Sequence, residues 1–405
     1  MPGPELGRRE AVALASLLTL TTLMAYLARV NLSVALPFIA DDYGWETAQL
    51  GELGGLLLGI FLIGYGISNV LIAPMVDHFG PKRGILASLL IFSTLTMLTG
   101  VLGLFYSVFL SLRLLIGLSQ GVIFPSASKI TQTCFPSGLR ARVNAMYLSS
   151  GFIANLLAPL LLIPLIQLTD WETMFHTVGL AGLVLMLPIA VLVRDGTEQR
   201  KTTAREVMKA TRQDVMETVR SRDVVLLTIA FTTTALVWWG LSLWLPTYLE
   251  EAKGFSIDDL VWAASLPYIG GVIGMFFGAW LSDRSGKRVE VIITFLVLCS
   301  ASVMLVTLTE GLLTVVTLAV VFFFQGATPP NVFTLLQGMV PGERISGATG
   351  FLNGISNGSG IFGTMAVGTF VALSGSYDSG LILIASVQLL GVVLFIAFRR
   401  RFGNA

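Results

Sequence analysis

Charged and chemically reactive side chains are scarce in this chain of 405 residues. Asp, Glu, Lys and Arg make up 12% of the sequence, about half the share of an average soluble domain. There are two histidines and two cysteines, Cys134 and Cys299, so a disulfide framework is excluded. No Ser/His/Asp or Cys/His set, metal-ligand spacing or phosphate-binding glycine loop occurs. The sequence therefore gives no basis for an enzyme, a metal centre or a cofactor.

Apolar residues, by contrast, dominate the chain. They make up 54% of it, and the mean hydropathy is +0.82. A helix needs about 20 apolar residues to cross roughly 30 Å of hydrocarbon, and such stretches recur along the whole sequence. We therefore predict an all-α integral membrane protein with twelve transmembrane helices. They are expected at residues 11–38, 48–76, 83–104, 106–131, 143–167, 174–194, 223–249, 257–282, 289–309, 312–339, 345–372 and 378–398.

The Lys and Arg residues fall on one side of this predicted topology. They gather in the loops on the side of the two termini, whereas the opposite loops are acidic, with Lys253 as their one cation. Loops on the cytoplasmic side carry the excess of Lys and Arg. We therefore expect a multi-pass protein of the cell inner membrane with both termini in the cytoplasm. A net charge of +1, spread over short loops, gives no sign of a nucleic-acid partner.

Two loop motifs repeat at half the chain length. Asp77 opens the run DHFGPKR after the second predicted span, and Asp283 opens DRSGKR after the eighth, 206 positions later. Arg140 and Arg344 follow the fourth and tenth spans and lie 204 positions apart. Nearly equal offsets in unrelated motifs predict two pseudo-symmetric six-helix halves, residues 1–194 and 223–405, joined by a charged cytoplasmic linker at 195–222. Such halves place a binding site at their interface near the membrane midplane.

Two arginines, Arg29 and Arg113, lie within predicted spans that hold no Asp or Glu at the same depth. A cation at the middle of a bilayer costs about 2.5–3.5 kcal/mol on insertion scales, so it normally faces a wet cavity or a partner. A guanidinium can hold a carboxylate through two parallel hydrogen bonds. We therefore expect an anionic ligand as the counter-charge. The alternative is that one arginine caps backbone carbonyls, or pairs with a helix end, to hold the two halves together.

Helical spacing predicts which side chains accompany the arginines. Tyr26 shares a face with Arg29, and Gln120 shares one with Arg113, where Gly117 is expected to leave room beside the cation. The predicted substrate-binding set adds two pairs from the C-terminal half that lie on the eleventh and seventh spans. These are Asn353 and Asn357, and Trp244 and Tyr248, the latter two as a gate at the outer end.

Two further segments of the C-terminal half interrupt helical patterns. The run 352–360 is rich in glycine, so its helix either bends there or packs its small residues closely against a neighbour. In the tenth span Gln325, Thr328, Pro329 and Pro330 predict a break that turns backbone carbonyls towards a cavity. Both segments fit a helix that lines a central site.

The quoted motifs resemble those of a known family. The loop from Asp77 to Arg83 resembles the signature of the major facilitator superfamily, with Ala73 where a small glycine usually opens the motif. The segments YLARVNLSVA at 26–35, RLLIGLSQG at 113–121 and WLPTYL at 244–249 are similar to the first, fourth and seventh spans of its anion:cation symporter family. That family includes sialin, the vesicular glutamate transporters and bacterial sugar-acid carriers such as the galactonate transporter. The resemblance implies the twelve-helix fold and alternating access, and it supports Arg29 as a substrate ligand.

The resemblance also implies a gate. In the superfamily the motif loops act as a latch that stabilises one open state, through ion pairs at helix ends. The residues that match these loops are Asp77, Gly80, Lys82, Arg83, Arg140, Asp283 and Arg284.

The chain departs from the family at the positions that carry coupling. The symporters have an Asp just before the first-span arginine and a Glu seven residues after the fourth-span arginine, and here these positions are Ala28 and Gln120. A proton symporter needs a group that titrates between the two faces, and neither side chain ionises. Uniport, anion exchange and sodium coupling all stay open, and Gln120, Asn155, Asn353 and Asn357 offer neutral oxygen atoms to a hard cation.

Together these features predict a monomeric secondary transporter that moves a small organic anion, such as a sugar acid or dicarboxylate, by alternating access. Its partners are the anion, the lipid bilayer and, under the sodium hypothesis, a coupling ion. The alternatives are an efflux pump for drugs or metabolites and a membrane sensor that binds an anion.

Overall fold

The computed structural model describes residues 8–72, 80–135, 143, 146–193, 206, 209, 216–340 and 345–402. The first half of the chain contains α1 (Arg8–Asp42), α2 (Thr47–Gln49), the π-helical turn η1 (Leu50–Gly54), α3 (Gly55–Leu71), α5 (Pro81–Leu102), α6 (Tyr106–Gln120), α7 (Ile123–Cys134), α9 (Ser150–Leu168) and α10 (Trp171–Leu192). The second half contains α12 (Arg222–Glu251), α13 (Ile257–Ala263), α14 (Pro267–Ser285), α15 (Arg288–Thr307), α16 (Gly311–Met339), α17 (Ile345–Gly358), α18 (Gly360–Ser374) and α19 (Tyr377–Phe402). No strand occurs among the described residues, and the predicted all-α class is confirmed.

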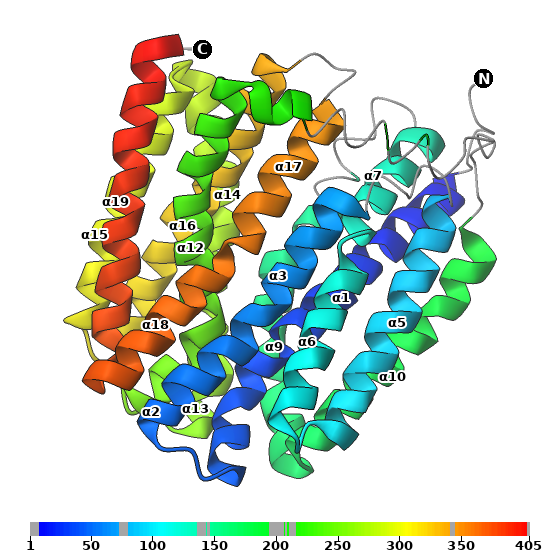
Figure 1. Ribbon diagram of the computed structural model, residues 1–405, viewed down its shortest axis with the longest axis vertical. Coiled ribbons are helices and arrows are strands. Elements are labelled where there is room, and N and C mark those ends of the chain that lie inside the picture. Colours follow the sequence, from blue (N-terminus) through cyan, green and yellow to red (C-terminus); the bar gives the residue numbers. More distant parts are fainter. Residues whose placement is uncertain are drawn as a thin grey trace.

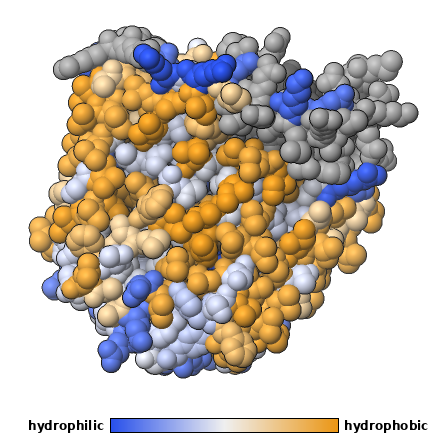
Figure 2. Space-filling model, viewed as in Figure 1, coloured by the Kyte–Doolittle hydropathy of each residue, from blue (hydrophilic) through white to orange (hydrophobic). Residues whose placement is uncertain are grey.

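The molecular surface is that of a membrane protein. Eleven helices within the described ranges are long and apolar enough to cross a bilayer. Figure 2 shows apolar surface over the sides of the bundle and polar residues at its two ends. On α10, Leu180, Val184, Leu187 and Val191 are each more than half exposed. Large apolar side chains that point outwards along a whole helix belong against lipid.

The predicted span at residues 345–372 is interrupted near its middle. It consists of the two shorter helices α17 and α18, which meet at Ser359. Neither helix alone has the length of a membrane span, but together α17 and α18 cover the predicted one. The backbone of Ser359 keeps nearly helical angles (φ −68°, ψ −14°), so the chain changes course there without reversing.

Prolines explain two other joints between helices. A proline inside a helix lacks the N–H that would bond to the residue four positions earlier, and its ring clashes with that carbonyl. Pro125 lies in the first turn of α7, just after the joint that separates it from α6. Pro267 opens α14 after the short helix α13. Both prolines lie within single predicted spans, at residues 106–131 and 257–282. Each of these spans therefore consists of two helices in succession.

The predicted break in the tenth span is wrong. Helix α16 runs from Gly311 to Met339 without interruption, although Pro329 and Pro330 lie inside it. Only the two hydrogen bonds that these prolines cannot donate are lost, because the surrounding turns remain helical. The carbonyls of Gln325 and Gly326 are the acceptors left without those donors.

Figure 1 shows two helix bundles that lie side by side, with both chain termini at one end and α2 and α13 at the other, here called the far end. One bundle contains α1 to α10 and the second contains α12 to α19. Contacts between the two join α3 to α17 and α18, α1 to α12, and α9 to α13 and α14. At the far end Gln167 Nε2 donates a hydrogen bond of 2.7 Å to Asp258 Oδ1, which ties α9 to α13.

Glycines allow α3 to approach α17 and α18 at backbone distance. A Cβ atom on Gly51 would lie 2.5 Å from the carbonyl oxygen of Gly368, and one on Gly66 would lie 2.8 Å from the Cα of Gly358. Both distances are shorter than real Cβ contacts, so these positions accept only glycine. Small residues of this kind let helices pack closely where lipid provides no hydrophobic drive. Gly354 and Gly358 in the run 352–360 therefore serve both as packing surface and as the approach to the Ser359 joint.

We predict that Gly368→Ala separates α18 from η1, the turn that leads into α3, because the added methyl group meets the carbonyl of Gly51. Overpacking of a tight contact costs about 1–3 kcal/mol. The melting temperature of the purified protein in detergent should fall. Gly338→Ala on α16 is the matched control, since nothing lies within 4 Å of its added Cβ. Equal melting temperatures in the two variants would contradict the assigned role of this seam.

Candidate substrate-binding site

Arg29 projects from the middle of α1 into the interface between the two bundles and is 1% exposed. Its Nη2 donates one hydrogen bond, of 3.1 Å, to Oε1 of Gln120 on α6. The Nε atom is buried and has no hydrogen-bond partner among the described residues. A guanidinium offers five N–H donors, so most of the donor capacity of Arg29 is unused by the side chains around it.

Aromatic rings enclose the Arg29 guanidinium. The distance from its Cζ to the ring centroid is 4.3 Å for Tyr65 and 4.4 Å for Tyr26. The corresponding distances are 5.1 Å for Phe61 and 5.8 Å for Trp239. Cations over aromatic faces gain about 2 kcal/mol or more when water is excluded. The rings thus stabilise the positive charge without neutralising it.

Arg113 has a different set of partners, all in the backbone of α1. Its Nη1 donates to the carbonyl of Ala28 at 3.3 Å, and its Nη2 donates to the carbonyl of Arg29 at 3.1 Å. The side chain is 1% exposed, and Nε has no partner within the described part of the chain. These bonds fix the stretch of α1 from which Arg29 projects. The backbone-capping alternative weighed from the sequence therefore describes the contacts of Arg113.

From its place on the Arg113 face, Gly117 is predicted to leave space beside the cation, but the structure has no such space. A Cβ there would collide with the carbonyl oxygen of Phe61 and lie 3.0 Å from the backbone nitrogen of Tyr65. The residue is a contact point between α6 and α3. By letting α3 come close, it brings the rings of Phe61 and Tyr65 next to the guanidinium groups.

The two buried cations lack any acidic partner. Among the described residues, no Asp or Glu lies within salt-bridge distance of Arg29 or Arg113; the ion pairs recorded there are Arg288–Asp283 and Arg399–Glu290. Both guanidinium groups lie near the same Phe61 ring, at 5.1 and 5.4 Å. An uncompensated charge in a water-poor interior is strongly unfavourable. An anion that enters between the bundles at Arg29 relieves that cost.

A chain of amide side chains links the Arg29 surroundings across the two bundles. Trp239 Nε1 donates to Asn357 Oδ1 at 2.9 Å, and Asn357 Nδ2 donates to Asn353 Oδ1 at 2.8 Å. Asn353 Nδ2 then donates to Oδ1 of Asn69 on α3, at 3.3 Å. Asn69 Nδ2 completes the chain with a bond of 3.0 Å to the carbonyl of Tyr65. The predicted pair Asn353 and Asn357 thus joins the half that holds Arg29.

Three members of this site were not predicted, although the sequence holds a signal for them. Phe61, Tyr65 and Asn69 recur every fourth residue along the second predicted span. That spacing places them on one helix face. Trp239 lies one turn before Leu243 in the seventh span, but aromatic residues are common there, and nothing in the sequence shows that it faces Arg29.

The predicted gate residues Trp244 and Tyr248 are fully buried and lie away from Arg29. Trp244 Nε1 donates to the carbonyl of Thr364 at 2.9 Å, and its ring packs at the glycine contact of α3 and α18. Tyr248 donates to Asp378 Oδ1 at 2.9 Å, nearer the far end. Trp244 therefore belongs to the packed seam between the bundles, whereas Tyr248 joins α12 to α19 within the second bundle.

The predicted gating loops are described only in part. Asp77 and Arg140 lie outside the described residues. Gly80 precedes α5 with a φ of +85°, which glycine adopts without strain, and Lys82 and Arg83 follow in the first turn. Asp283 accepts a bond of 2.7 Å from Arg288, and Arg284 lies 5.5 Å from the ring centroid of Trp280. These contacts lie within the C-terminal half at the end that holds the termini.

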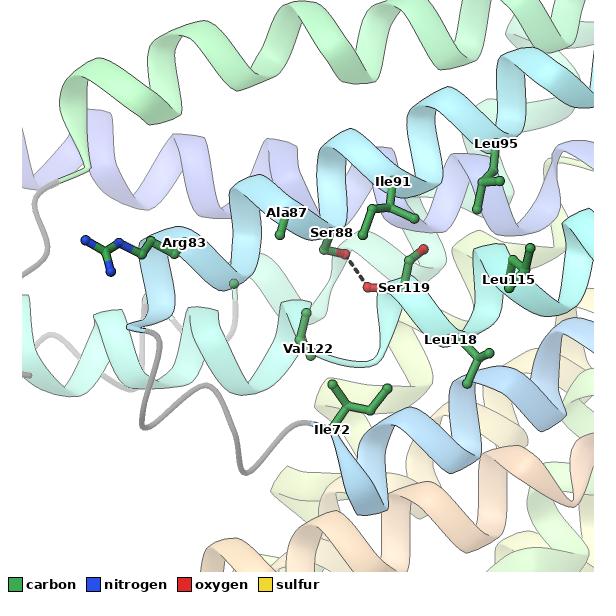
Figure 3. A pocket seen from close by; sticks show the side chains of 11 residues that line it. Ile72, Arg83, Ala87, Ser88, Ile91, Leu95, Leu115, Leu118, Ser119 and Val122 are labelled. Carbon is green, nitrogen blue, oxygen red and sulfur yellow. Dashed lines mark hydrogen bonds between the residues drawn. The ribbon is translucent and has the colours of Figure 1, made fainter. Parts of the chain in front are cut away.

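The structure has a pocket that lies away from Arg29. A groove of about 600 Å³ lies on the outside of the first bundle, between α5 and the α6–α7 joint (Figure 3). Its walls include Ile91 and Leu115, which are almost half exposed, and Ser88 donates across it to the carbonyl of Ser119. Arg83 points out of one end. Its apolar side faces where lipid would be, so it is no candidate for a polar substrate.

Two bundles of membrane-spanning helices around a buried cationic centre define a membrane transport protein. The model of the Major Facilitator Superfamily matches residues 18–261 and 252–404, and the chain belongs to this superfamily. It is therefore a multi-pass transporter and not an enzyme.

Three relatives align over nearly the whole chain. A probable sulfoacetate transporter of Cupriavidus necator is 28% identical over 91% of this chain and 89% of its own length. A quinolone resistance transporter of Acinetobacter baumannii is 27% identical over 93% and 91%. A hexuronate transporter of Bacillus subtilis is 24% identical over 95% and 93%. Among solved structures, a D-xylose-proton symporter has the same fold, with a TM-score of 0.79, 13% identity and coverage of 96% and 98%.

The contacts predict unlike consequences for conservative exchanges of the two arginines. Arg113→Lys keeps the charge, but a single ammonium group replaces the planar fork that reaches two carbonyls, so one carbonyl loses its donor. We expect a loss of about 1–3 kcal/mol and a lower melting temperature. Arg29→Lys should change the melting temperature less, because Arg29 donates one hydrogen bond. If both exchanges lowered the melting temperature equally, the two arginines would have the same structural role.

Proposed function

We propose that the protein carries a small organic anion across the cell inner membrane by alternating access, with Arg29 as the main ligand of the anion. The observation that carries this proposal is the buried guanidinium of Arg29, which has one polar side-chain partner and no carboxylate nearby. Both termini would lie in the cytoplasm, as the distribution of Lys and Arg indicates.

Electrostatics favours an anion over a neutral or cationic substrate. Arg29 and Arg113 place two positive charges beside one phenyl ring in a part of the protein that excludes water. An anion gains from both charges, whereas a cation is repelled by both. The free donors of Arg29 suit a planar carboxylate or a sulfonate, since both present oxygen atoms to the guanidinium edge. The names of the sulfoacetate and hexuronate carriers agree with this chemistry.

The surroundings of Arg29 also define where the rest of the substrate lies. Tyr26, Tyr65 and Trp239 line the site with flat faces and polar edges. Asn357 is hydrogen-bonded to Trp239, and Asn353 to Asn357. These two amides can exchange their mutual hydrogen bond for hydrogen bonds to a hydroxylated substrate. The substrate thus needs an acid group for Arg29 and further oxygen atoms for the amides. A sugar acid or short dicarboxylate has both, with hydroxyl or carboxylate oxygen atoms near the amides.

Access to the site requires the two halves to move. Arg29 is almost completely covered, and contacts between the halves close the far end through α1, α9, α12 and α13. Rocking of the halves around a fixed midplane site is the motion that exposes it to each face in turn. We assign Trp244 and Tyr248 to the far-end closure and the motif loops, including Asp77, Arg83, Arg140 and Asp283, to the opposite one.

Efflux of an aromatic compound is the second candidate. The quinolone resistance transporter is nearly as similar to this chain as the sulfoacetate carrier, and the Arg29 site is rich in aromatic rings that suit a flat ligand. Arg29 would then hold an acidic group on the exported compound. The two candidates differ in substrate and direction but use the same cation.

Uptake into proteoliposomes tests the proposal with a panel of labelled sulfoacetate, a hexuronate, a dicarboxylate and a fluoroquinolone. Arg29→Gln removes the charge, and the loss of a charged hydrogen-bond pair should weaken binding of the transported anion at least about tenfold. Arg399→Gln is the control, because it removes an arginine from an exposed ion pair, which contributes little.

Uptake of one anion that is lost in Arg29→Gln and kept in Arg399→Gln would support the organic-anion carrier. Transport of the fluoroquinolone alone would favour efflux. Equal anion uptake by Arg29→Gln and the unmodified protein would reject Arg29 as the main ligand.

A further inference from the structure

A small polar cavity lies between the two halves, one helical turn beyond Arg29 towards the far end. Its volume is about 10 Å³, which corresponds to one particle of the size of water. Four polar residues line it: Ser33 from α1, Asn155 from α9, Ser242 from α12 and Tyr268 from α14. Each is at most 5% exposed. The cavity thus lies among buried residues and receives side chains from both halves.

Prolines deprive backbone oxygen atoms of their helical donors at the same place. Pro159 and Pro246 both line the cavity, and each lies inside a helix. Because proline has no N–H, the carbonyls of Asn155 and Ser242, four residues earlier, lose their helical donor. Ser33 Oγ and Tyr268 OH both approach the Ser242 carbonyl, at 3.4 Å each. The main bond of the Ser33 hydroxyl is to the carbonyl of Leu243, at 2.6 Å.

The side-chain oxygen atoms around the cavity have unused lone pairs. Ser33 and Tyr268 donate their hydrogen atoms to carbonyls, so their oxygen atoms remain acceptors. Asn155 donates Nδ2 to the carbonyl of Gly151 at 2.8 Å, which leaves its Oδ1. Ser242 Oγ is buried without any hydrogen-bond partner in the described part of the chain. A buried hydroxyl in that position is open to a partner held in the cavity, either an ion or a water molecule.

We propose that this cavity binds a single Na⁺ ion that travels with the organic anion. The inference rests on the proposed anion transport and names its coupling ion. The site offers only neutral oxygen atoms from hydroxyls, an amide and freed carbonyls, which are ligands for a hard cation. Interrupted backbone in membrane transporters coordinates Na⁺ in the same way. Divalent cations usually require carboxylates, and none of the residues that line this cavity is acidic.

The position of the cavity links the ion to the anion. Ser33 follows Arg29 by four residues, a rise of about 6 Å along the helix. Without an anion, the charge of Arg29 repels Na⁺; an anion on Arg29 cancels that repulsion. Each ligand therefore strengthens binding of the other, and the effect is reciprocal. Because α1, α9, α12 and α14 all contribute ligands, a bound ion also favours contact of the two halves.

This coupling needs no carboxylate that titrates. Ala28 and Gln120 occupy the positions where related symporters have acidic residues, and Gln120 Oε1 accepts a bond from Arg29. A Na⁺ ion one turn away supplies the thermodynamic drive that a proton supplies in those symporters.

The test measures the dependence of anion uptake and of protein melting temperature on Na⁺, with choline as the replacement cation. In proteoliposomes, inward Na⁺ gradients are compared with proton gradients, with uptake of ²²Na⁺ as a direct readout. The double variant Ser33→Ala/Ser242→Ala removes two ligand hydroxyls. Ser88→Ala is the matched control, since it removes a buried serine hydroxyl in the lipid-facing groove, away from both proposed sites.

We expect the Na⁺ concentration for half-maximal uptake to rise at least tenfold in the double variant and to stay within twofold in Ser88→Ala. Anion affinity at saturating Na⁺ should stay within threefold. Arg29→Gln should no longer transport the anion, yet Na⁺ alone should raise its melting temperature more than that of the unmodified protein, because the repulsion is gone.

Three results would overturn the inference. They are anion uptake that ignores Na⁺, an unchanged Na⁺ dependence in the double variant, and no effect of Na⁺ on the melting temperature of Arg29→Gln. In each case the cavity holds water only. Failure of the anion proposal is distinct, since it appears as uptake that Arg29→Gln leaves intact.

Discussion

The positive charge held inside the bundle is the constraint on which the rest of the structure depends. Two guanidinium groups in a low-dielectric interior must be stabilised by other groups, and here these groups are aromatic rings and backbone carbonyls instead of carboxylates. Arg113 uses both of its Nη groups on the α1 backbone and leaves only Nε without a partner, whereas Arg29 donates one hydrogen bond and keeps most of its donors. The surrounding helices are therefore organised to present one unsatisfied cation at the interface of two halves that can separate.

Close packing and irregular backbone have distinct places in this design. Glycine contacts bring α3 against α6 in its own half and against α17 and α18 in the other. Pro125 and Pro267 divide two spans into pairs of helices, and Pro246 leaves the Ser242 carbonyl without its helical donor, so this carbonyl accepts from Ser33 and Tyr268 instead. Irregular backbone inside a membrane is tolerated where protein or a cavity satisfies it. The freed carbonyls next to Ser33 meet that condition.

The sequence predicted the fold better than the site. Apolar length and the repeated loop motifs define helices and halves, since both are local or simply periodic signals. Arg29 and Arg113 stood out because charge is rare in such spans, but their different roles depend on which helix each guanidinium reaches across the bundle. Trp239 and Asn69 contact partners more than a hundred residues away, and no local pattern records that. At Pro329 and Pro330 the local rule failed, because the turns on either side keep α16 intact.

The smooth contact of α3 with α17 and α18 has a mechanical consequence. Much of this contact consists of glycine and backbone, and the Asn353–Asn69 hydrogen bond is its side-chain link, so a small rotation of one helix on the other disturbs few side chains. This contact is therefore suited to be the line about which the two halves rotate in the proposed alternating access. On the opposite side, contacts such as Gln167–Asp258 and Ser33–Leu243 are discrete and must break and re-form. In the proposed alternating access, the halves would stay joined along α3, α17 and α18 while the far end opens by breaking a few polar contacts.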